Sequence, residues 1–317
     1  MQQSNVLDIS STSSNQQMVD LVTEEMESSK LSQAQAAKEI GISETALSQW
    51  RRQKYSGDNS AVEIKIENWL STKAKRRQSD QMLPDAPDYY ETYSGKRITS
   101  TLTYAHMAAD LVVIYGGAGV GKTKSTRRYA KANPNVWIIE GTPTCNTMGG
   151  FLRHLAAALG VRLPKGHHDV LEANLRERLK DCGGLIIVDE AQFLNERALE
   201  IARRLAEMTN NGLALVGNET VYAQLTGRNR AAEFAQLFSR IGKKVRLTRP
   251  TPTDIEAACK AWDITNRAER DLLADIAAKP GALRMMTKTL RLAGLMAKGG
   301  KITIEHLKAA WKDLGGE

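Results

Sequence analysis

Cysteine is scarce in this sequence of 317 residues. The three cysteines, Cys145, Cys182 and Cys259, are far apart and form no Cys-x-x-Cys pair. This spacing argues against a disulfide framework and against a zinc site, and it fits a reducing compartment. We therefore expect the three thiols to behave as small, buried apolar groups.

Long apolar runs are absent as well. No stretch approaches the roughly 20 apolar residues that a membrane-spanning helix needs. The amino-terminal residues MQQSNVLDISSTSSNQQ have neither a basic start nor an apolar centre, so they do not resemble a signal peptide. The sequence predicts a cytoplasmic protein that has no membrane partner.

Positive charge is in excess. Lysine and arginine number 44 against 36 aspartates and glutamates, which gives a formal net charge of +8. A basic balance favours polyanionic partners such as nucleic acids or nucleotides. A solvated surface without any particular partner has the same composition, so the charge alone does not decide between them.

Composition changes along the chain divide it into segments. Residues 1–17 are rich in Ser, Gln and Asn and are predicted to be a disordered tail. Apolar residues recur at helical spacing over residues 18–80, which predicts an all-α domain. Residues 81–97 contain Pro84 and Pro87 among polar residues and are predicted to be a linker.

The pattern after residue 98 is that of an α/β fold. Short apolar runs alternate with longer amphipathic segments, and most of these runs are continuous enough to be covered on both faces of a parallel sheet. The predicted strands are Leu111–Tyr115, Asn135–Glu140, Leu185–Asp189, Leu213–Gly217 and Lys243–Leu247. We therefore predict an α/β core over residues 98–250, followed by a helical lid domain over residues 251–317.

A glycine-rich loop follows the first predicted strand. Its residues fit the pattern G-x-x-x-x-G-K-[ST], and a helix-forming segment comes next. Glycines let backbone N–H groups approach a phosphate, and a helix N-terminus adds a favourable dipole. Lys122 is expected to reach the β- and γ-phosphates of ATP, and Thr123 to ligate Mg²⁺. The predicted ATP contacts in this loop are Gly116, Gly117, Ala118, Gly119, Val120, Gly121, Lys122, Thr123 and Lys124.

The segment LIIVDEAQ supplies two carboxylates at the end of a buried strand. Ligands of open α/β sheets bind at this carboxyl edge. Asp189 is expected to hold Mg²⁺, and Glu190 to orient and deprotonate the attacking water. Because binding without turnover would need only the glycine-rich loop, the carboxylate pair favours an ATPase over a nucleotide-binding switch.

At this point the core resembles the AAA+ ATPases. In that resemblance Asn218, after the strand LALVGN, is the sensor that positions the lytic water. Arg240 corresponds to the arginine finger that reaches a neighbouring subunit, and Arg284 in KPGALR to the nucleotide contact from the lid. Two simpler interpretations stay open: Arg240 as a surface arginine, and Asn218 as the cap of the following helix.

The segment LSQAQAAKEIGISETALSQWRRQKY has the form of a helix-turn-helix. A helix over Ser32–Ile40 is expected to turn at Gly41, where a positive φ costs little, and to be followed by a second helix capped by Ser43. Leu47 and Trp50 are expected to face inward. The candidate DNA contacts on the outer face are Ser43, Thr45, Ser48, Gln49, Arg51 and Arg52. The same geometry serves protein contacts in small helical bundles, so the partner of this face stays open.

Further basic residues are weaker candidates for DNA contact. The run Lys73, Lys75, Arg76 and Arg77 either lies on phosphates or forms the solvated end of a helix. The core residues Arg176, Arg178, Lys180, Arg203 and Arg204 are better interpreted as ordinary surface charges on amphipathic helices.

The closer resemblance is to the family of phage Mu transposition protein B, and it covers nearly the whole chain. It rests on the helix-turn-helix segment, the linker, the phosphate loop and the segments NVWIIEGTPTC, LIIVDEA, EFAQLFSRI and KPGALR. The resemblance implies an ATP-dependent ATPase that binds double-stranded DNA with little sequence preference and assembles as a helical filament or ring. It further implies that the protein captures target DNA for a transposase, in the host cytoplasm if a phage encodes it.

Two other functions remain open at this stage. One is a replication initiator or helicase loader of the same ATPase class, which would favour a specific origin or a helicase partner. The other is a transcription regulator whose helix-turn-helix binds an operator and for which ATP is only a ligand. The carboxylate pair argues against the second.

Overall fold

The computed structural model describes residues 8–82, 87, 89–162, 168–226 and 239–316. The chain forms two compact units, residues 1–84 and 85–317. Within the described residues, no helix is both long enough and apolar enough to cross a membrane.

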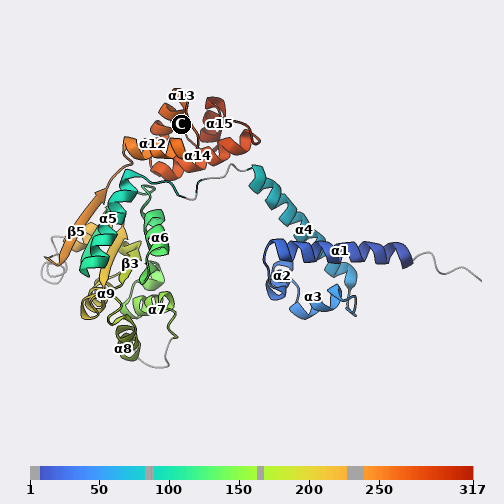
Figure 1. Ribbon diagram of the computed structural model, residues 1–317, viewed down its shortest axis with the longest axis horizontal. Helices are drawn as coiled ribbons and strands as arrows, with labels where there is room; N and C mark the ends of the chain where they lie inside the picture. The colour runs from blue at the N-terminus through green and yellow to red at the C-terminus, as the bar shows by residue number, and fades with distance from the viewer. Residues whose placement is uncertain (1–7, 83–86, 88, 163–167, 227–238, 317) are drawn as a thin grey trace, which may run out of the picture. The chain divides into compact units, whose positions relative to one another are not determined.

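The first unit is a bundle of helices (Figure 1). Its helices are α1 (Asp8–Ser28), α2 (Gln33–Ile40), α3 (Glu44–Arg51) and α4 (Asn59–Met82). Their apolar faces share one cluster, in which Leu47, Trp50 and Ile66 are among the most deeply buried side chains. The expectation that Leu47 and Trp50 face inward is confirmed.

Local capping explains why α2 and α3 are separate helices. The Ser32 hydroxyl accepts from the backbone N–H of Gln35, and the Ser43 hydroxyl from that of Ala46. Gly41 ends α2 with φ at 80°, a conformation that a residue with a Cβ adopts only at a cost. The predicted caps and the predicted turn are thus confirmed.

The prediction of a disordered tail over residues 1–17 is wrong from Asp8 onward, because α1 begins there. Residues 1–7 lie outside the described residues. Gln16 hydrogen-bonds Asp20 one turn further along α1, and it accepts from Gln53 after α3. Once a packed helix exists, each added residue contributes a backbone hydrogen bond without a new nucleation cost, so even a polar segment can extend it.

The second unit is built on a five-stranded parallel sheet. Its strands are β1 (Leu111–Gly116), β2 (Val136–Glu140), β3 (Leu185–Asp189), β4 (Gly212–Gly217) and β5 (Ile241–Leu247). Their order across the sheet is β2-β3-β4-β1-β5. All five predicted strands are confirmed, and so is the α/β fold class.

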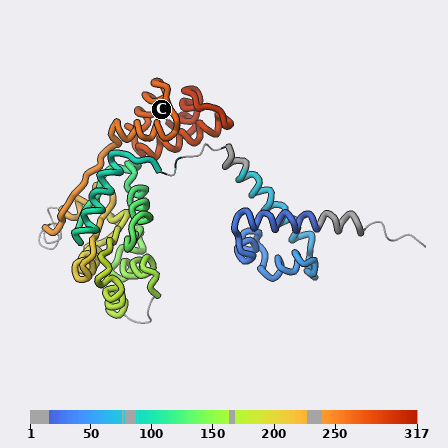
Figure 2. Tube along the Cα trace, viewed as in Figure 1, coloured from blue at the N-terminus to red at the C-terminus, as the bar shows by residue number. Residues whose placement is uncertain are grey.

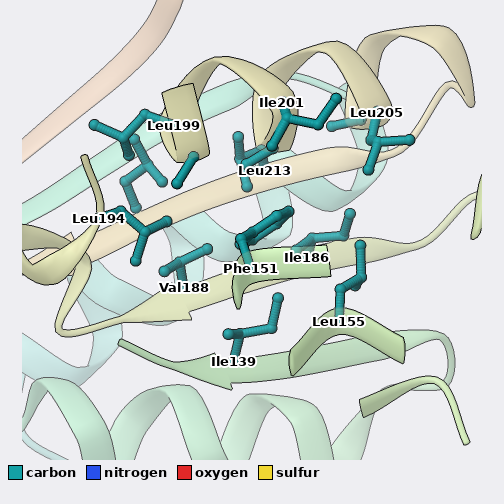
Figure 3. Close-up of a cluster of buried hydrophobic side chains, with 14 of the residues drawn as sticks. Ile139, Phe151, Leu155, Ile186, Val188, Leu194, Leu199, Ile201, Leu205 and Leu213 are labelled. Atoms are coloured by element: carbon teal, nitrogen blue, oxygen red, sulfur yellow. The ribbon is translucent and has the colours of Figure 1, made fainter. Parts of the chain in front are cut away.

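Helices cover both faces of the sheet. They are α5 (Tyr93–Ala108), α6 (Lys122–Ala132), α7 (Met148–Ala158), α8 (His168–Leu179), α9 (Glu196–Met208) and α10 (Glu219–Thr226). One apolar cluster joins α5 and α6 to one face, and a second joins α7 to α10 to the other. Figure 3 shows the second cluster, where Phe151 lies among Ile186, Val188 and Leu213.

Strand β2 differs from the expectation that the apolar strands are covered on both faces. Val136, Trp137 and Ile138 are only half-buried. The reason is the strand order, which places β2 at an edge of the sheet. Position in a sheet depends on the pairing of distant strands, and the local apolar pattern does not report it.

The predicted linker over residues 81–97 is also too long. Helix α4 runs to Met82, and α5 begins at Tyr93 after the cap Thr92, whose hydroxyl accepts from the N–H of Gly95. The α/β core therefore starts before residue 98. Residues 83–86 and 88, which include Pro84, lie outside the described residues.

Four helices form the carboxyl-terminal lid, drawn in orange to red in Figure 2. They are α12 (Pro252–Ala261), α13 (Arg267–Ala278), α14 (Ala282–Met296) and α15 (Ile304–Asp313). Their apolar cluster is separate from those of the sheet and includes Leu273, Leu290 and Leu307. The predicted helical lid is thus present.

A buried carboxylate fastens the lid to the core. Asp254 in α12 is fully buried and accepts from the backbone N–H and the hydroxyl of Ser94, at 2.9 and 2.6 Å. It also accepts from the backbone N–H of Thr251 at 2.8 Å. One side chain thereby satisfies donors at the starts of both α5 and α12.

We expect Asp254→Ala to lower the free energy of unfolding by about 2–4 kcal/mol, because three donors would lose their acceptor in a buried site. Urea unfolding followed by circular dichroism measures this loss. The matched control is Asp271→Ala, whose side chain is 72% exposed, and which should change stability by less than about 0.5 kcal/mol. Equal effects of the two substitutions would contradict this account of Asp254.

Candidate functional site

Three adjacent strand ends carry the predicted site residues. Strand β4 pairs with β1 on one side and with β3 on the other. The glycine-rich loop leaves β1, Asn218 follows β4, and Asp189 ends β3. Because parallel strands end at the same edge of a sheet, the fold brings these segments together.

The loop itself starts in close contact with the sheet. Gly116 has φ at 136°, and a Cβ there would lie 2.1 Å from the carbonyl oxygen of Leu247 in β5. The next residue, Gly117, donates its backbone N–H to the same oxygen at 2.8 Å. Only residues without a side chain fit here, which explains the two glycines.

The lid touches the middle of the loop. A Cβ on Gly119 would lie 1.9 Å from the carbonyl oxygen of Gly281 and 3.3 Å from the Cβ of Arg284. Gly281 and Arg284 belong to the start of α14. The structure therefore brings Arg284, predicted as the lid contact, next to the loop.

Lys122 lies at the start of α6, immediately after the left-handed Gly121. Its ammonium donates to the carbonyl oxygens of Gly116 at 2.9 Å and Gly117 at 2.7 Å. Burial lowers the pKa of Lys122, while the negative charges of Glu190 and Asp189 act in the opposite direction. The lysine is thus held over the loop beside two carboxylates, where a polyphosphate would add further negative charge.

Asp189 is 5% exposed at the end of β3. Burial raises its pKa, and a hydrogen bond from the Thr123 side chain acts in the opposite direction. The backbone N–H of Glu190 also donates to it at 3.0 Å. A carboxylate and a hydroxyl in contact are oxygen ligands of the kind that Mg²⁺ takes, so Asp189 and Thr123 fit a magnesium site.

Glu190 stands on a strained backbone. Its φ of 54° lies in the left-handed region, which is uncommon for a residue with a side chain. Its carboxylate accepts a hydrogen bond from the amide of Gln192. The side-chain oxygen Oε1 of Gln192 in turn accepts from the backbone N–H of Asn218 at 3.4 Å. Residues after β3 and after β4 are thereby linked through one amide side chain.

Gln192 is the residue that sequence reasoning missed. It follows Glu190 by two positions in a short turn, and no motif marks it. A signal is present at Gly217, where a Cβ would lie 2.3 Å from the side-chain oxygen Oε1 of Gln192. A glycine at the end of an otherwise apolar strand indicates a close neighbour, although the sequence does not say which one.

Asn218 makes the contact of a helix cap. Its side-chain oxygen accepts from the backbone N–H of Thr220 at 2.8 Å, at the start of α10. The simpler interpretation of this residue therefore describes the contact in the structure. Its predicted role toward the lytic water stays a prediction.

Arg240 lies outside the cluster of residues around the loop. It precedes β5, its side chain is 55% exposed, and its guanidinium donates to Glu207 of α9 at 2.9 Å. Most of the preceding segment, residues 227–238, lies outside the described residues. An exposed arginine away from the loop of its own chain agrees with a role toward a neighbouring copy, which stays a prediction.

The candidate DNA contacts of α3 do not all face outward. Thr45, Gln49 and Arg52 are exposed. Arg51 is instead half-buried, and its guanidinium donates to the hydroxyl of Thr23 at 3.1 Å. Its guanidinium is thus engaged by α1 and not free on the outer face, and its contact with DNA stays a prediction.

The structure also limits how Ser43 and Ser48 could contact DNA. The Ser43 hydroxyl is engaged as the cap of α3, although the residue is exposed. Ser48 is half-buried. In the basic run, Lys73 pairs with Glu39 at 2.8 Å and Arg77 with Glu25 at 2.8 Å, so these two side chains bind the bundle itself.

The fold and the site together define a P-loop ATPase. A model described as "AAA domain" matches residues 105–225, which span the loop and both carboxylates. A second model, "Mu B transposition protein, C terminal", matches residues 239–314.

Relatives extend this match over most of the chain. The chain is 38% identical over 282 residues to the "ATP-dependent target DNA activator B" of Escherichia phage Mu, covering 88% of this chain and 89% of that protein. The protein of the same name from Escherichia phage D108 matches equally. The "Mu-like prophage FluMu DNA transposition protein B" of Haemophilus influenzae is 32% identical, covering 86% and 94%. The chain belongs to the Mu B transposition protein family.

Among solved structures, the fold is similar to one described as Drosophila ORC bound to DNA. The TM-score is 0.50 at 16% identity, and the match covers 76% of this chain and 65% of that chain. At this identity the likeness concerns the fold alone.

We expect Gly119→Ala to weaken ATP binding by about ten- to a hundredfold, since displacing positioned groups by about 1 Å has effects of this size. The new Cβ would push the start of α14 away from the loop, and φ at +79° adds backbone strain. Titration with a fluorescent ATP analogue measures the affinity. The control is Gly160→Ala, which has φ at +66° but open space around it. Wild-type affinity in Gly119→Ala would contradict the contact between lid and loop.

Proposed function

We propose that this protein is an ATP-dependent DNA-binding ATPase that oligomerises on target DNA and activates a transposase. The observation that carries the proposal is the arrangement around the loop. Lys122 lies over the glycine-rich backbone, Asp189 contacts Thr123, and Arg284 reaches the loop from the lid. The names of the relatives, which speak of ATP-dependent activation of target DNA, supply the biological setting.

The residues around the loop would divide the work of hydrolysis among them. Backbone N–H groups of Gly116 to Lys124 and the ammonium of Lys122 would bind the phosphates. Thr123 and Asp189 would hold Mg²⁺, which when bound stabilises the charge that develops on the phosphates. Arg284 would contact the nucleotide and so connect it to the lid through α14.

Glu190 would act as the general base for the attacking water. Its left-handed backbone and its hydrogen bond to Gln192 limit where the carboxylate can lie. Asn218, linked to the same Gln192, would help to orient that water. A carboxylate fixed in advance loses little freedom when it accepts the proton, which favours the reaction.

A nucleotide held between adjacent copies would control the grip on DNA. Arg240 would reach the nucleotide of a neighbouring subunit and so couple ATP binding to assembly as a filament or ring. The grip would rest on phosphate contacts by basic side chains, so it would have little sequence preference and would weaken with salt. In the amino-terminal unit, the candidates for such contacts are Ser43, Thr45, Ser48, Gln49, Arg51 and Arg52. Of these, Ser43, Thr45, Gln49 and Arg52 are exposed.

We expect Lys122→Ala to abolish ATP-dependent binding to duplex DNA, because the loop would lose its cation. Glu190→Gln should lower ATP turnover by at least about a hundredfold, the scale of a general base, while ATP and DNA remain bound. Filter binding with and without ATP, together with phosphate release, measures both effects. Lys131→Ala, an exposed lysine further along α6, is the control. If both variants bind DNA like the wild type without nucleotide, the coupling is refuted.

Random duplex DNA, added as a competitor, should reduce binding to any labelled duplex. The reduction should depend on the total length of competitor DNA and not on its sequence, because phosphate contacts carry no sequence information. The measurement is a gel shift at several salt concentrations. A replication initiator would instead resist the competitor at its origin. A transcription regulator would bind its operator without ATP, and residues 18–80 alone would suffice.

A further inference from the structure

Four charged side chains form a connected group between α9 and the start of β5. Arg203 donates to the carboxylates of Glu200 and Glu207, which lie on either side of it along α9. Arg240 donates through Nη1 to Oε1 of Glu207 at 2.9 Å, while Oε2 of Glu207 faces Arg203. Glu207 therefore joins the two arginines.

The inner part of this group is nearly buried. The Arg203 side chain is 11% exposed, so this residue is not the ordinary surface charge that the sequence suggested. Its two carboxylate partners raise the pKa of Arg203, and Arg203 lowers that of Glu200. Because both partners sit on the same helix, at i−3 and i+4, the carboxylate of Glu207 has a defined position.

The outer part of the group is open. Arg240 is 55% exposed and uses Nη1 for the contact with Glu207. An exposed arginine ordinarily samples many rotamers, and that freedom is lost when its guanidinium binds an anion. A contact with a fixed carboxylate removes part of this freedom in advance.

We propose that Glu207 is a positioning residue that orients Arg240 toward the nucleotide of a neighbouring copy. The inference rests on the proposed function, in which Arg240 acts across the subunit interface. Glu207 shares its charge with Arg203, so its hold on Arg240 is weaker than that of a polyphosphate. The contact therefore orients Arg240 but leaves it free to bind the nucleotide of the neighbouring copy.

The proposal predicts that kcat falls when the Glu207 carboxylate is removed. Glu207→Gln should lower kcat of ATP hydrolysis, measured with duplex DNA present, by about three- to fivefold, the upper range for an exposed ion pair. KM for ATP should stay near the wild-type value, since the loop of each subunit is unchanged. A carboxylate that withheld Arg240 would give the opposite result, a rise in kcat, and this outcome overturns the proposal.

The chain offers a matched control in Glu200→Gln. Glu200 and Glu207 lie on the same helix, pair with the same arginine and have similar exposures of 43% and 41%. Among the described residues, Arg240 hydrogen-bonds Glu207, whereas its charge acts on Glu200 only from a distance, where it lowers the pKa of that carboxyl. Thermal midpoints should fall alike in both variants, whereas kcat should fall in Glu207→Gln alone. Equal losses of kcat overturn the proposal, because they would trace the effect to α9 itself.

Mixing subunits tests the action across the interface. Glu190→Gln subunits keep Arg240 and Glu207 but lack the base, so they should raise turnover per Glu207→Gln subunit when added in excess. Glu190→Gln/Arg240→Ala subunits should fail to do so. Absence of recovery with the first mixture overturns the proposal.

The variant Arg240→Ala distinguishes the role of Arg240 at the subunit interface from the role of Glu207. If it leaves turnover unchanged, the role of Arg240 in the proposed function is wrong, and the role of Glu207 falls with it. If it lowers turnover by roughly a hundredfold or more, as for other arginine fingers, while Glu207→Gln behaves like Glu200→Gln, only the role of Glu207 is refuted.

Discussion

The close approach of the glycine-rich loop to its neighbours is the constraint on which the site depends. Gly116 and Gly117 press against the backbone that ends β5, and Gly119 presses against the start of α14. The loop therefore has contacts with the sheet on one side and with the lid on the other. Because Gly119 directly adjoins the backbone of Gly281, a ligand that shifted this part of the loop toward the lid would press on the start of α14.

A second constraint is the way in which charged groups are held. Asp254 fastens the lid to the core through donors from two helix starts, and Asp189 lies buried beside Thr123 and Lys122. Glu190 is held by Gln192 on a strained turn. Buried charges without partners are costly, so each of these groups is paired in the described residues. The same pairing keeps the functional groups in place.

Sequence reasoning succeeded where the chemistry is local. The glycine-rich loop, the five strands and the caps Ser32 and Ser43 each depend on residues close together in the chain. It did not foresee the contacts that distant segments decide. Arg51 was placed on an outer face but contacts α1, and Arg203 was taken for a surface charge but lies between two carboxylates. Neither contact has a spacing that could be read along the chain.

The sequence by itself determined the class of site, because phosphate binding requires glycines, a lysine and a hydroxyl in a fixed order on one short segment. It also determined the family, since the similarity extends over most of the chain. Only the tertiary structure decided that Gln192 joins Glu190 to Asn218 and that Glu207 holds Arg240. These contacts link different strands and helices, and the packing of those elements sets which side chains meet.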